Sequence, residues 1–340
     1  MKKMLVIGTV WPEPKSSAAG TRMLQLLQLF LNQKFEVHFA CSAEKSEFSY
    51  NLSEINVHCH QILLNDSSFD QFVKELNADF VMFDRFMIEE QFAWRIREIS
   101  PDTLTILDTE DLHFLREARY QALKNNASDI SNFLFSDKTK REIASILRCD
   151  LSLIISEFEM DLLRDKFKIP TTILAYLPFW VDDIPKLNPT FNERKDFLFI
   201  GNFYHEPNID AVLTLKKEIW PRIRKMDKSL KINIYGAYIP EKILQLNNPQ
   251  EGFFIRGRAD EVSVVMQNAR VFLAPLRFGA GQKGKLLEAM IYGLPSITTP
   301  VGAEGMFGKF EWNGFVSSNW DIFCENALKL YTSDSAWEKA

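Results

Sequence analysis

The segment Leu273–Met290 has the sequence LAPLRFGAGQKGKLLEAM, in which an apolar run is followed by a glycine-rich turn and a helical pattern. Gly279, Gly281 and Gly284 carry no side chain, so a ligand could approach the backbone of this turn closely. The backbone N–H groups at the start of a helix favour an anion. The segment therefore predicts a strand, an anion-binding turn and a helix in succession.

Lys283 and Lys285 lie in the expected first helical turn, where positive charge opposes the helix dipole. A bound phosphate would explain both lysines, and Glu288, one turn further on, is suited to bind ribose hydroxyls. The segment matches neither the dinucleotide-binding pattern GxGxxG nor a P-loop. A tight turn with two solvated lysines therefore stays open as the alternative interpretation.

Short apolar runs alternate with longer amphipathic stretches on both sides of this segment. This alternation predicts parallel sheets covered by helices on both faces. The expected strands are Met4–Gly8, Phe35–Cys41, Phe80–Phe83, Leu104–Leu107 and Leu151–Ile155, then Phe197–Ile200, Lys231–Tyr235, Gly252–Ile255, Val271–Ala274 and Pro295–Thr298.

The alternation pauses over Tyr176–Arg194, which contains three prolines and has a linker composition. A length of 340 residues also favours two domains. We therefore predict an α/β fold with two Rossmann-like parallel-sheet domains, residues 1–184 and 185–340. Ligands of such sheets bind beyond the carboxyl ends of the strands, so we expect the site in a cleft between the two domains.

Composition excludes several classes of protein. The net charge of −5 argues against a nucleic-acid binder, which usually has a basic excess. The four cysteines are scattered without a CxxC pair, as in a reduced cytosolic protein. The N-terminal sequence MKKMLVIG predicts a first strand and not a signal peptide, and no run of 18 apolar residues predicts a membrane span. We expect a cytoplasmic protein, with peripheral contact at the inner face of the membrane left open.

A series of short motifs follows in order through the second half. They are FIGNFYHEPN at 199–208, IYG at 234–236, Gly257-Arg258, Arg277–Glu288, GLP at 293–295 and TPVGAEG at 299–305. Together they resemble the C-terminal half of the group 1 glycosyltransferases (family 4), which have the GT-B fold. The resemblance is strong from about residue 197 to 306. It is weaker in the N-terminal half, where residues 11–20 and 108–113 fit a related bacterial subgroup.

The resemblance implies a site for a nucleotide-sugar donor. Glu288 matches the glutamate that binds ribose, whereas the family's first glutamate falls on Ala280, so the Glu-x7-Glu motif is incomplete. The family's basic pair is also absent, and Asn202 and Asn208 stand near its places. Backbone amides and lysines would then bind the diphosphate. The implied donor residues are Gly201, Asn202, Asn208, Tyr235, Gly257, Arg258, Arg277, Gly279, Ala280, Gly281, Lys283, Lys285 and Glu288.

The N-terminal half supplies the expected acceptor side. Gly20 and Arg22 follow the first strand in a loop that related enzymes place near the donor phosphates and the acceptor, although an ordinary helix start with a Ser or Thr N-cap fits equally well. Asp84 and Asp111 follow later strand ends and are assigned to the acceptor pocket, with an internal Asp84–Arg85 ion pair as the alternative.

His113 matches a family histidine that contacts the donor sugar. The alternative is a histidine that bonds Asp111 or caps the next helix. With Lys285 and Glu288, His113 completes the catalytic set that we predict.

No cofactor and no metal are predicted. The chain has no convincing Asp-x-Asp motif of the kind that metal-dependent transferases use. His58 and His60 would share one face of a strand, but no further ligand pair is evident in the sequence.

The resemblance thus implies a metal-independent, retaining glycosyltransferase. It would move a hexose-type sugar from a nucleoside-diphosphate sugar to a glycan, lipid or other acceptor, for example in cell-envelope polysaccharide synthesis. A catalytically inactive binding or scaffold protein and a sugar-nucleotide epimerase on the same fold are the alternatives. Related enzymes usually continue with a helix that returns to the N-terminal domain, and we expect residues 185–340 to lack it.

Overall fold

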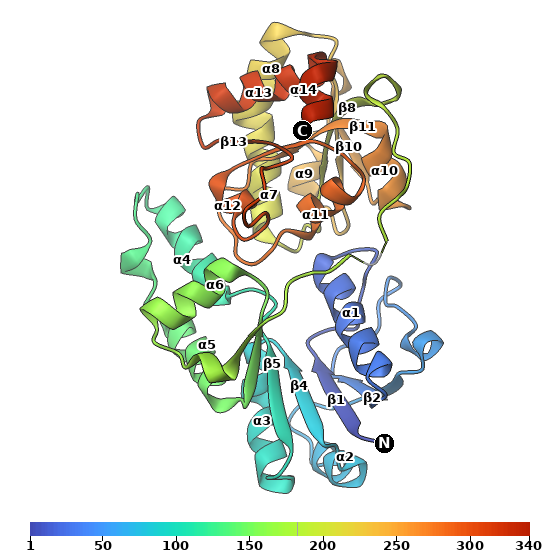
Figure 1. Ribbon diagram of the computed structural model, residues 1–340, viewed down its shortest axis with the longest axis vertical. Helices are drawn as coiled ribbons and strands as arrows, with labels where there is room; N and C mark the ends of the chain where they lie inside the picture. The colour runs from blue at the N-terminus through green and yellow to red at the C-terminus, as the bar shows by residue number, and fades with distance from the viewer. Residues whose placement is uncertain (182) are drawn as a thin grey trace. The chain divides into compact units, whose positions relative to one another are not determined.

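The computed structural model describes residues 1–181 and 183–340. The chain forms two compact units, Met1–Phe179 and Trp180–Ala340, each a parallel sheet flanked by helices (Figure 1). The division falls between Phe179 and Trp180, within the proline-containing segment but before the boundary expected between residues 184 and 185. The α/β class with two parallel sheets is confirmed.

The N-terminal sheet has seven strands in the order β3-β2-β1-β4-β5-β6-β7. Its strands are β1 Lys3–Gly8, β2 Glu36–Cys41, β3 His58–Gln61, β4 Phe80–Asp84, β5 Leu104–Asp108, β6 Leu151–Ile154 and β7 Leu174–Tyr176. The strand order changes direction at β1, which pairs with both β2 and β4. In doubly wound folds, ligands bind outside the carboxyl ends of the strands at such a point.

Six α-helices accompany this sheet among the described residues. They are α1 Ala18–Asn32, α2 Ser68–Leu76, α3 Phe86–Ile99, α4 His113–Lys124, α5 Asp137–Arg148 and α6 Glu157–Asp161. A π-helical turn, Leu162–Lys166, continues α6, and short 3-10 turns cover Leu52–Ile55, Ser131–Phe133 and Thr171–Ile173. The edge strand β3 and the last strand β7 were not among the expected strands.

The C-terminal sheet has six strands in the order β10-β9-β8-β11-β12-β13. They are β8 Lys195–Ile200, β9 Ile232–Tyr235, β10 Phe253–Gly257, β11 Ala269–Ala274, β12 Ser296–Thr298 and β13 Gly314–Val316. Its α-helices are α7 Glu206–Thr214, α8 Trp220–Met226, α9 Glu241–Leu244, α10 Val262–Asn268, α11 Gly284–Ile291, α12 Pro300–Ala303, α13 Trp320–Thr332 and α14 Asp334–Lys339. A π-helical turn, Leu215–Ile219, joins α7 to α8, and 3-10 turns lie at Phe191–Glu193 and Pro249–Glu251.

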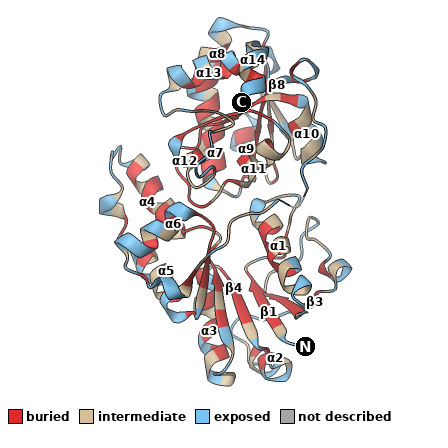
Figure 2. Cartoon of the chain, in the orientation of Figure 1, coloured by how far each residue is buried: buried red, intermediate tan, exposed pale blue. Residues whose placement is uncertain are grey.

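The central strands carry the two cores. Leu5–Ile7 of β1 and Phe197–Phe199 of β8 are almost wholly buried, and Figure 2 shows buried residues along the strands of both sheets. Parallel strands covered on both faces must be apolar on both faces, which is why these runs do not alternate with polar residues. Within the part of the chain that the structure describes, no helix is both long and apolar enough to cross a membrane.

Candidate functional site

The glycine-rich turn joins β11 to α11 as the sequence predicts. Gly279 and Gly281 have φ angles of 150° and 64°, which residues with a side chain rarely adopt. Helix α11 begins at Gly284, with Lys283 at its N-cap position. The N–H groups of this helix start are therefore presented next to a turn whose backbone conformation requires glycine.

Lys285 lies in the first turn of α11 and contacts residues that follow β8. Its Nζ atom donates to Oδ1 of Asn208, and Nδ2 of the same Asn208 side chain donates to the Asn202 carbonyl at 2.6 Å. A Cβ atom placed on Gly201 would come within 3.0 Å of the same Nζ atom. Strands β8 and β11 are neighbours in the sheet, so residues about 80 positions apart in the sequence meet here.

Burial decides the protonation of the two charged groups on α11. It lowers the pKa of Lys285 to about 7; Glu288 partly opposes this effect, and the charge of Lys283 adds to it. Burial also raises the pKa of Glu288 to about 7, against the opposing charge of Lys285. An anion bound beside Lys285 would favour the ammonium form and raise its pKa again.

Two other basic residues predicted for the donor site, Lys283 and Arg277, form contacts elsewhere in the unit. Nζ of Lys283 is almost wholly buried and donates to the Gly281 carbonyl at 2.5 Å, so it ties the glycine turn together. Arg277 forms an ion pair with Asp210, with 2.9 Å between Nε and Oδ2. Lys285, by contrast, lies next to Gly201 and Asn208.

The carboxyl ends of β9 and β10 lie beside Gly201. Tyr235 is the last residue of β9, and the Gly236 amide that follows donates to the Gly257 carbonyl at 2.9 Å. Gly257 ends β10 after a register shift and has a φ angle of 82°, with no atom within 4 Å of the position a Cβ would take. The backbone conformation, not a lack of space, is therefore what favours glycine at position 257.

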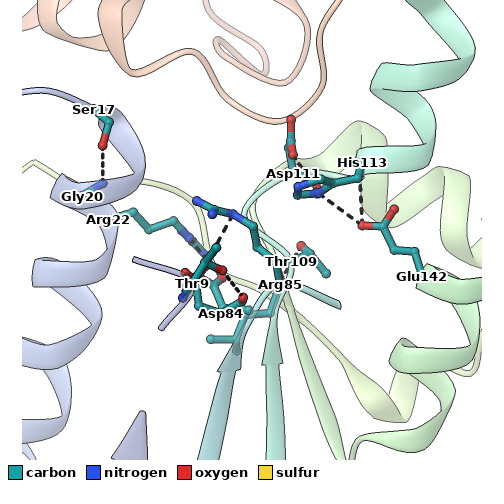
Figure 3. A network of polar contacts seen from close by, with 12 residues as sticks. Thr9, Ser17, Gly20, Arg22, Asp84, Arg85, Thr109, Asp111, His113 and Glu142 are labelled. Carbon is teal, nitrogen blue, oxygen red and sulfur yellow. Dashed lines mark hydrogen bonds and ion pairs between the residues drawn. The ribbon is translucent and has the colours of Figure 1, made fainter. Parts of the chain in front are cut away.

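A second group of polar residues lies at the carboxyl ends of β1, β4 and β5, and we call it the N-terminal polar cluster. Its members are Thr9, Arg22, Asp84, Arg85, Asp108, Glu110, Asp111, His113 and Glu142; Figure 3 shows most of them. Sequence reasoning did not assign Thr9, Asp108, Glu110 and Glu142 to a site. Thr9, Asp108 and Glu110 lie at or just after the ends of predicted strands, and this position could have identified them as site residues. Glu142 lies within α5, where no such position marks it.

Arg22 forms a buried ion pair at the centre of this cluster. Its Nη2 and Nε atoms lie 2.9 and 3.2 Å from Oδ1 of Asp108, and both side chains are fully buried. Its Nη1 atom donates to the Leu177 carbonyl at 2.8 Å. Helix α1 places Arg22 in the interior of the unit, where it compensates the carboxylate at the end of β5.

Asp84 is bound within the unit as well. Its Oδ2 atom accepts from the Thr9 amide at 2.9 Å, and its Oδ1 atom lies 3.6 Å from Nε of Arg85. Arg85 has a left-handed φ angle of 73°, and its amide donates to the Asp108 carbonyl at 2.8 Å. The structure therefore contains the internal Asp84–Arg85 ion pair that the sequence left as an alternative.

His113 is the first residue of α4 and is held by Asp111 and Glu142. Nδ1 lies 3.1 Å from the Asp111 carbonyl and 3.6 Å from Oε1 of Glu142, while Glu142 accepts from the amides of His113 and Phe114 (Figure 3). A proton on Nδ1 satisfies these oxygens and leaves Nε2 as a hydrogen-bond acceptor. The imidazole is thus fixed in orientation as well as position.

Glu110 combines a left-handed backbone conformation with a raised pKa. Its φ angle of 63° is left-handed, a strained conformation that is concentrated at functional sites. Burial raises its pKa to about 8; Arg85 opposes the shift, and Asp108 adds to it. A glutamic acid in this state is protonated for most of the time at neutral pH.

Gly20 has a packing role at the start of α1. A Cβ atom there would lie 2.4 Å from the Glu13 backbone, and the Gly20 amide donates to the Ser17 hydroxyl at 3.0 Å. Ser17 is therefore the N-cap of α1, as in the alternative interpretation of this loop.

Residues 194–333 match the family described as glycosyl transferases group 1. The family resemblance noted in the sequence is thereby confirmed. A Klebsiella pneumoniae protein, described as an uncharacterized 44.6 kDa protein in the cps region, is 23% identical over 341 residues. That alignment covers 90% of this chain and 84% of the relative.

Solved structures with the same fold have much lower sequence identity. Anabaena HepE in complex with UDP and glucose has a TM-score of 0.69 at 9% identity, covering 99% of this chain and 94% of its own. Sucrose-phosphate synthase from Thermosynechococcus elongatus has a TM-score of 0.67 at 14% identity; the match covers 99% of this chain and 91% of the synthase. S. aureus TarM in complex with UDP has a TM-score of 0.60 at 15% identity; the match covers 79% of this chain and about half, 52%, of TarM. These likenesses show that the chain has the GT-B fold.

Proposed function

We propose that the chain is a retaining, metal-independent transferase that moves a hexose-type sugar from a uridine diphosphate sugar to a glycan or lipid-linked acceptor. One observation carries the proposal: the buried amino group of Lys285 lies beside Asn208 and Gly201, at a helix start that follows a glycine turn. Fixed positive charge and N–H donors at one point are what a departing diphosphate requires.

The roles of the donor residues follow from the charge that develops during transfer. Glycosyl transfer passes through an oxocarbenium-like state, and negative charge grows on the nucleoside diphosphate as it leaves. Lys285 and the amides of α11 would stabilise that charge, and Glu288 would accept hydrogen bonds from ribose hydroxyls. His113 would contact the transferred sugar through Nε2. Asp111, which holds the imidazole of His113, belongs to the acceptor side of this proposal.

The choice of uridine and of acceptor is supported by the relatives. UDP is bound in the structures of HepE and TarM. The K. pneumoniae relative is described by its place in a capsule (cps) region. We therefore assign the chain to cell-envelope polysaccharide synthesis in the cytoplasm.

Calorimetric titration with UDP, GDP and ADP tests the donor assignment. We expect UDP to bind more tightly than GDP and ADP, and incubation with UDP-sugars to release UDP slowly in the absence of an acceptor. If no nucleotide binds and no sugar nucleotide is consumed, the chain is a binding or scaffold protein. If UDP-N-acetylglucosamine alone yields an epimer, the chain is an epimerase.

UDP affinity should depend on pH through Lys285. Its pKa of about 7 in the unliganded protein means that the ammonium form becomes scarcer as the pH rises. Binding must then take up a proton, so Kd should rise by up to about tenfold per pH unit between pH 7.5 and 9. Titrations in two buffers of different ionisation enthalpy will measure the proton uptake.

The matched control for this pH dependence is Lys285→Arg. A guanidinium stays protonated throughout this range, so the variant should bind UDP with a nearly constant Kd. A parent protein whose Kd is the same at pH 7.5 and pH 9 would contradict the assignment of Lys285 to the diphosphate.

A further inference from the structure

Four side chains of types that can bind metal ions lie at the β3 edge of the N-terminal sheet. Glu36 and His38 alternate along β2, and His58 and His60 alternate along β3. The register pairs His38 with His58 and Ala40 with His60, so all four side chains project from the same face. One ligand atom each from Glu36, His38 and His58 lies within 4.8 Å of the other two.

We propose that Glu36, His38 and His58 form a binding site for a divalent transition metal ion of the Zn²⁺ type. Imidazole nitrogens with one carboxylate oxygen are a common ligand set for such ions, and three protein ligands leave a position for water. The exposed side chain of His58 keeps that position accessible. The site is remote in sequence from the donor residues and has no role in the transfer that we propose.

The hydrogen bonds around His38 fit a metal ligand. Nδ1 of His38 lies 3.0 Å from Nε2 of His60, and Nε2 of His38 lies 3.1 Å from Oε1 of Glu36. If His38 donates its Nδ1 proton to His60, then Nε2 keeps a lone pair that faces the Glu36 carboxylate, and a cation between them would satisfy both. Tetrahedral Zn²⁺, with bonds of about 2.0–2.2 Å, separates neighbouring ligand atoms by roughly 3.3–3.5 Å. The 3.1 Å between Nε2 of His38 and Oε1 of Glu36 is close to this value, and the His58 ligand atom lies within 4.8 Å of both.

His60 acts as a positioning residue in this arrangement. A ligating histidine usually bonds its second ring nitrogen to a partner that fixes its tautomer and orientation. The His60 ring is itself held in place. Its centroid lies 4.7 Å from that of the Phe72 ring of α2 and 5.2 Å from that of the His38 ring, on which it is stacked. A bound ion would thus fasten the short edge strand β3 to β2 through side chains.

Titration of the full chain with ZnCl₂, and with CoCl₂ followed by visible absorption, tests the site. We expect one ion per chain and a rise in Tm of roughly 5 °C or more at saturating Zn²⁺. His58→Ala should abolish both effects and still fold, because His58 is exposed. His60→Ala should weaken Zn²⁺ binding about 10- to 100-fold while retaining a stoichiometry of one.

His205→Ala, in the C-terminal unit, is the matched control and should bind Zn²⁺ like the parent. The proposal is overturned if the parent binds no Zn²⁺ or Co²⁺, or if His58→Ala binds either ion as tightly as the parent.

Discussion

Lys285→Ala should weaken UDP binding about 100- to 1,000-fold and reduce sugar transfer by at least as much. Removing one preorganised charge or donor from a developing anion typically costs a factor of that size. Lys285 lies against Asn208 and beside Gly201, whereas Lys283 bonds the glycine turn and Arg277 bonds Asp210. Calorimetric titration and UDP release from a UDP-sugar measure the two effects.

Folding and binding can be separated in this variant. Burial disfavours the charged form of Lys285, so replacing it should leave Tm unchanged or slightly higher. Lys225→Ala, at an exposed lysine of the same unit, is the control and should bind UDP like the parent. If Lys285→Ala binds UDP as tightly as Lys225→Ala does, the diphosphate is held elsewhere.

Arg22→Met should destabilise the N-terminal unit by about 3–5 kcal/mol. The substitution leaves the Asp108 carboxylate buried without its positive partner, and breaking a buried ion pair on one side has that cost. For a unit of this size, the loss corresponds to a fall in Tm of about 10 °C. Calorimetry of the full chain, with the transitions of the two units analysed separately, will measure it.

Two further variants define the origin of this loss. Arg22→Met combined with Asp108→Asn removes both charges and should recover most of the lost stability. Arg141→Met breaks an ion pair with Glu90 that is partly exposed to solvent, and should cost less than about 1 kcal/mol. Equal losses in the free energy of unfolding for Arg22→Met and Arg141→Met would show that the buried Arg22–Asp108 pair stabilises the unit no more than the partly exposed pair does.

The long apolar strands could be predicted from the sequence, whereas the short edge strands could not. Strands such as β1 and β8 are buried on both faces and therefore appear as uninterrupted apolar runs. The edge strand β3 has the sequence HCHQ, and β7 and β13 have three residues each. Such strands bury too little surface to leave a hydrophobic pattern, so pairing with a neighbour defines them.

The candidate site could be predicted only in part, because spacing does not reveal which distant side chains meet. The glycine turn and helix start were visible in the segment Leu273–Met290 itself. The meeting of Lys285 with Asn208 depends on β8 and β11 being neighbours in the sheet. Arg22 was predicted to face an acceptor, but its long side chain reaches inward to Asp108. The left-handed backbone of Arg85 and Glu110 has no sequence signature at all.

The protonation of Glu110 changes the electrostatic character of the N-terminal polar cluster. The sequence Asp108-Thr109-Glu110-Asp111 suggests three negative charges, yet with a pKa of about 8 the Glu110 side chain is a neutral carboxylic acid at pH 7 for most of the time. A neutral carboxylic acid donates a hydrogen bond through its O–H group. In its protonated form Glu110 therefore acts as a hydrogen-bond donor, and the segment carries less negative charge than its sequence suggests.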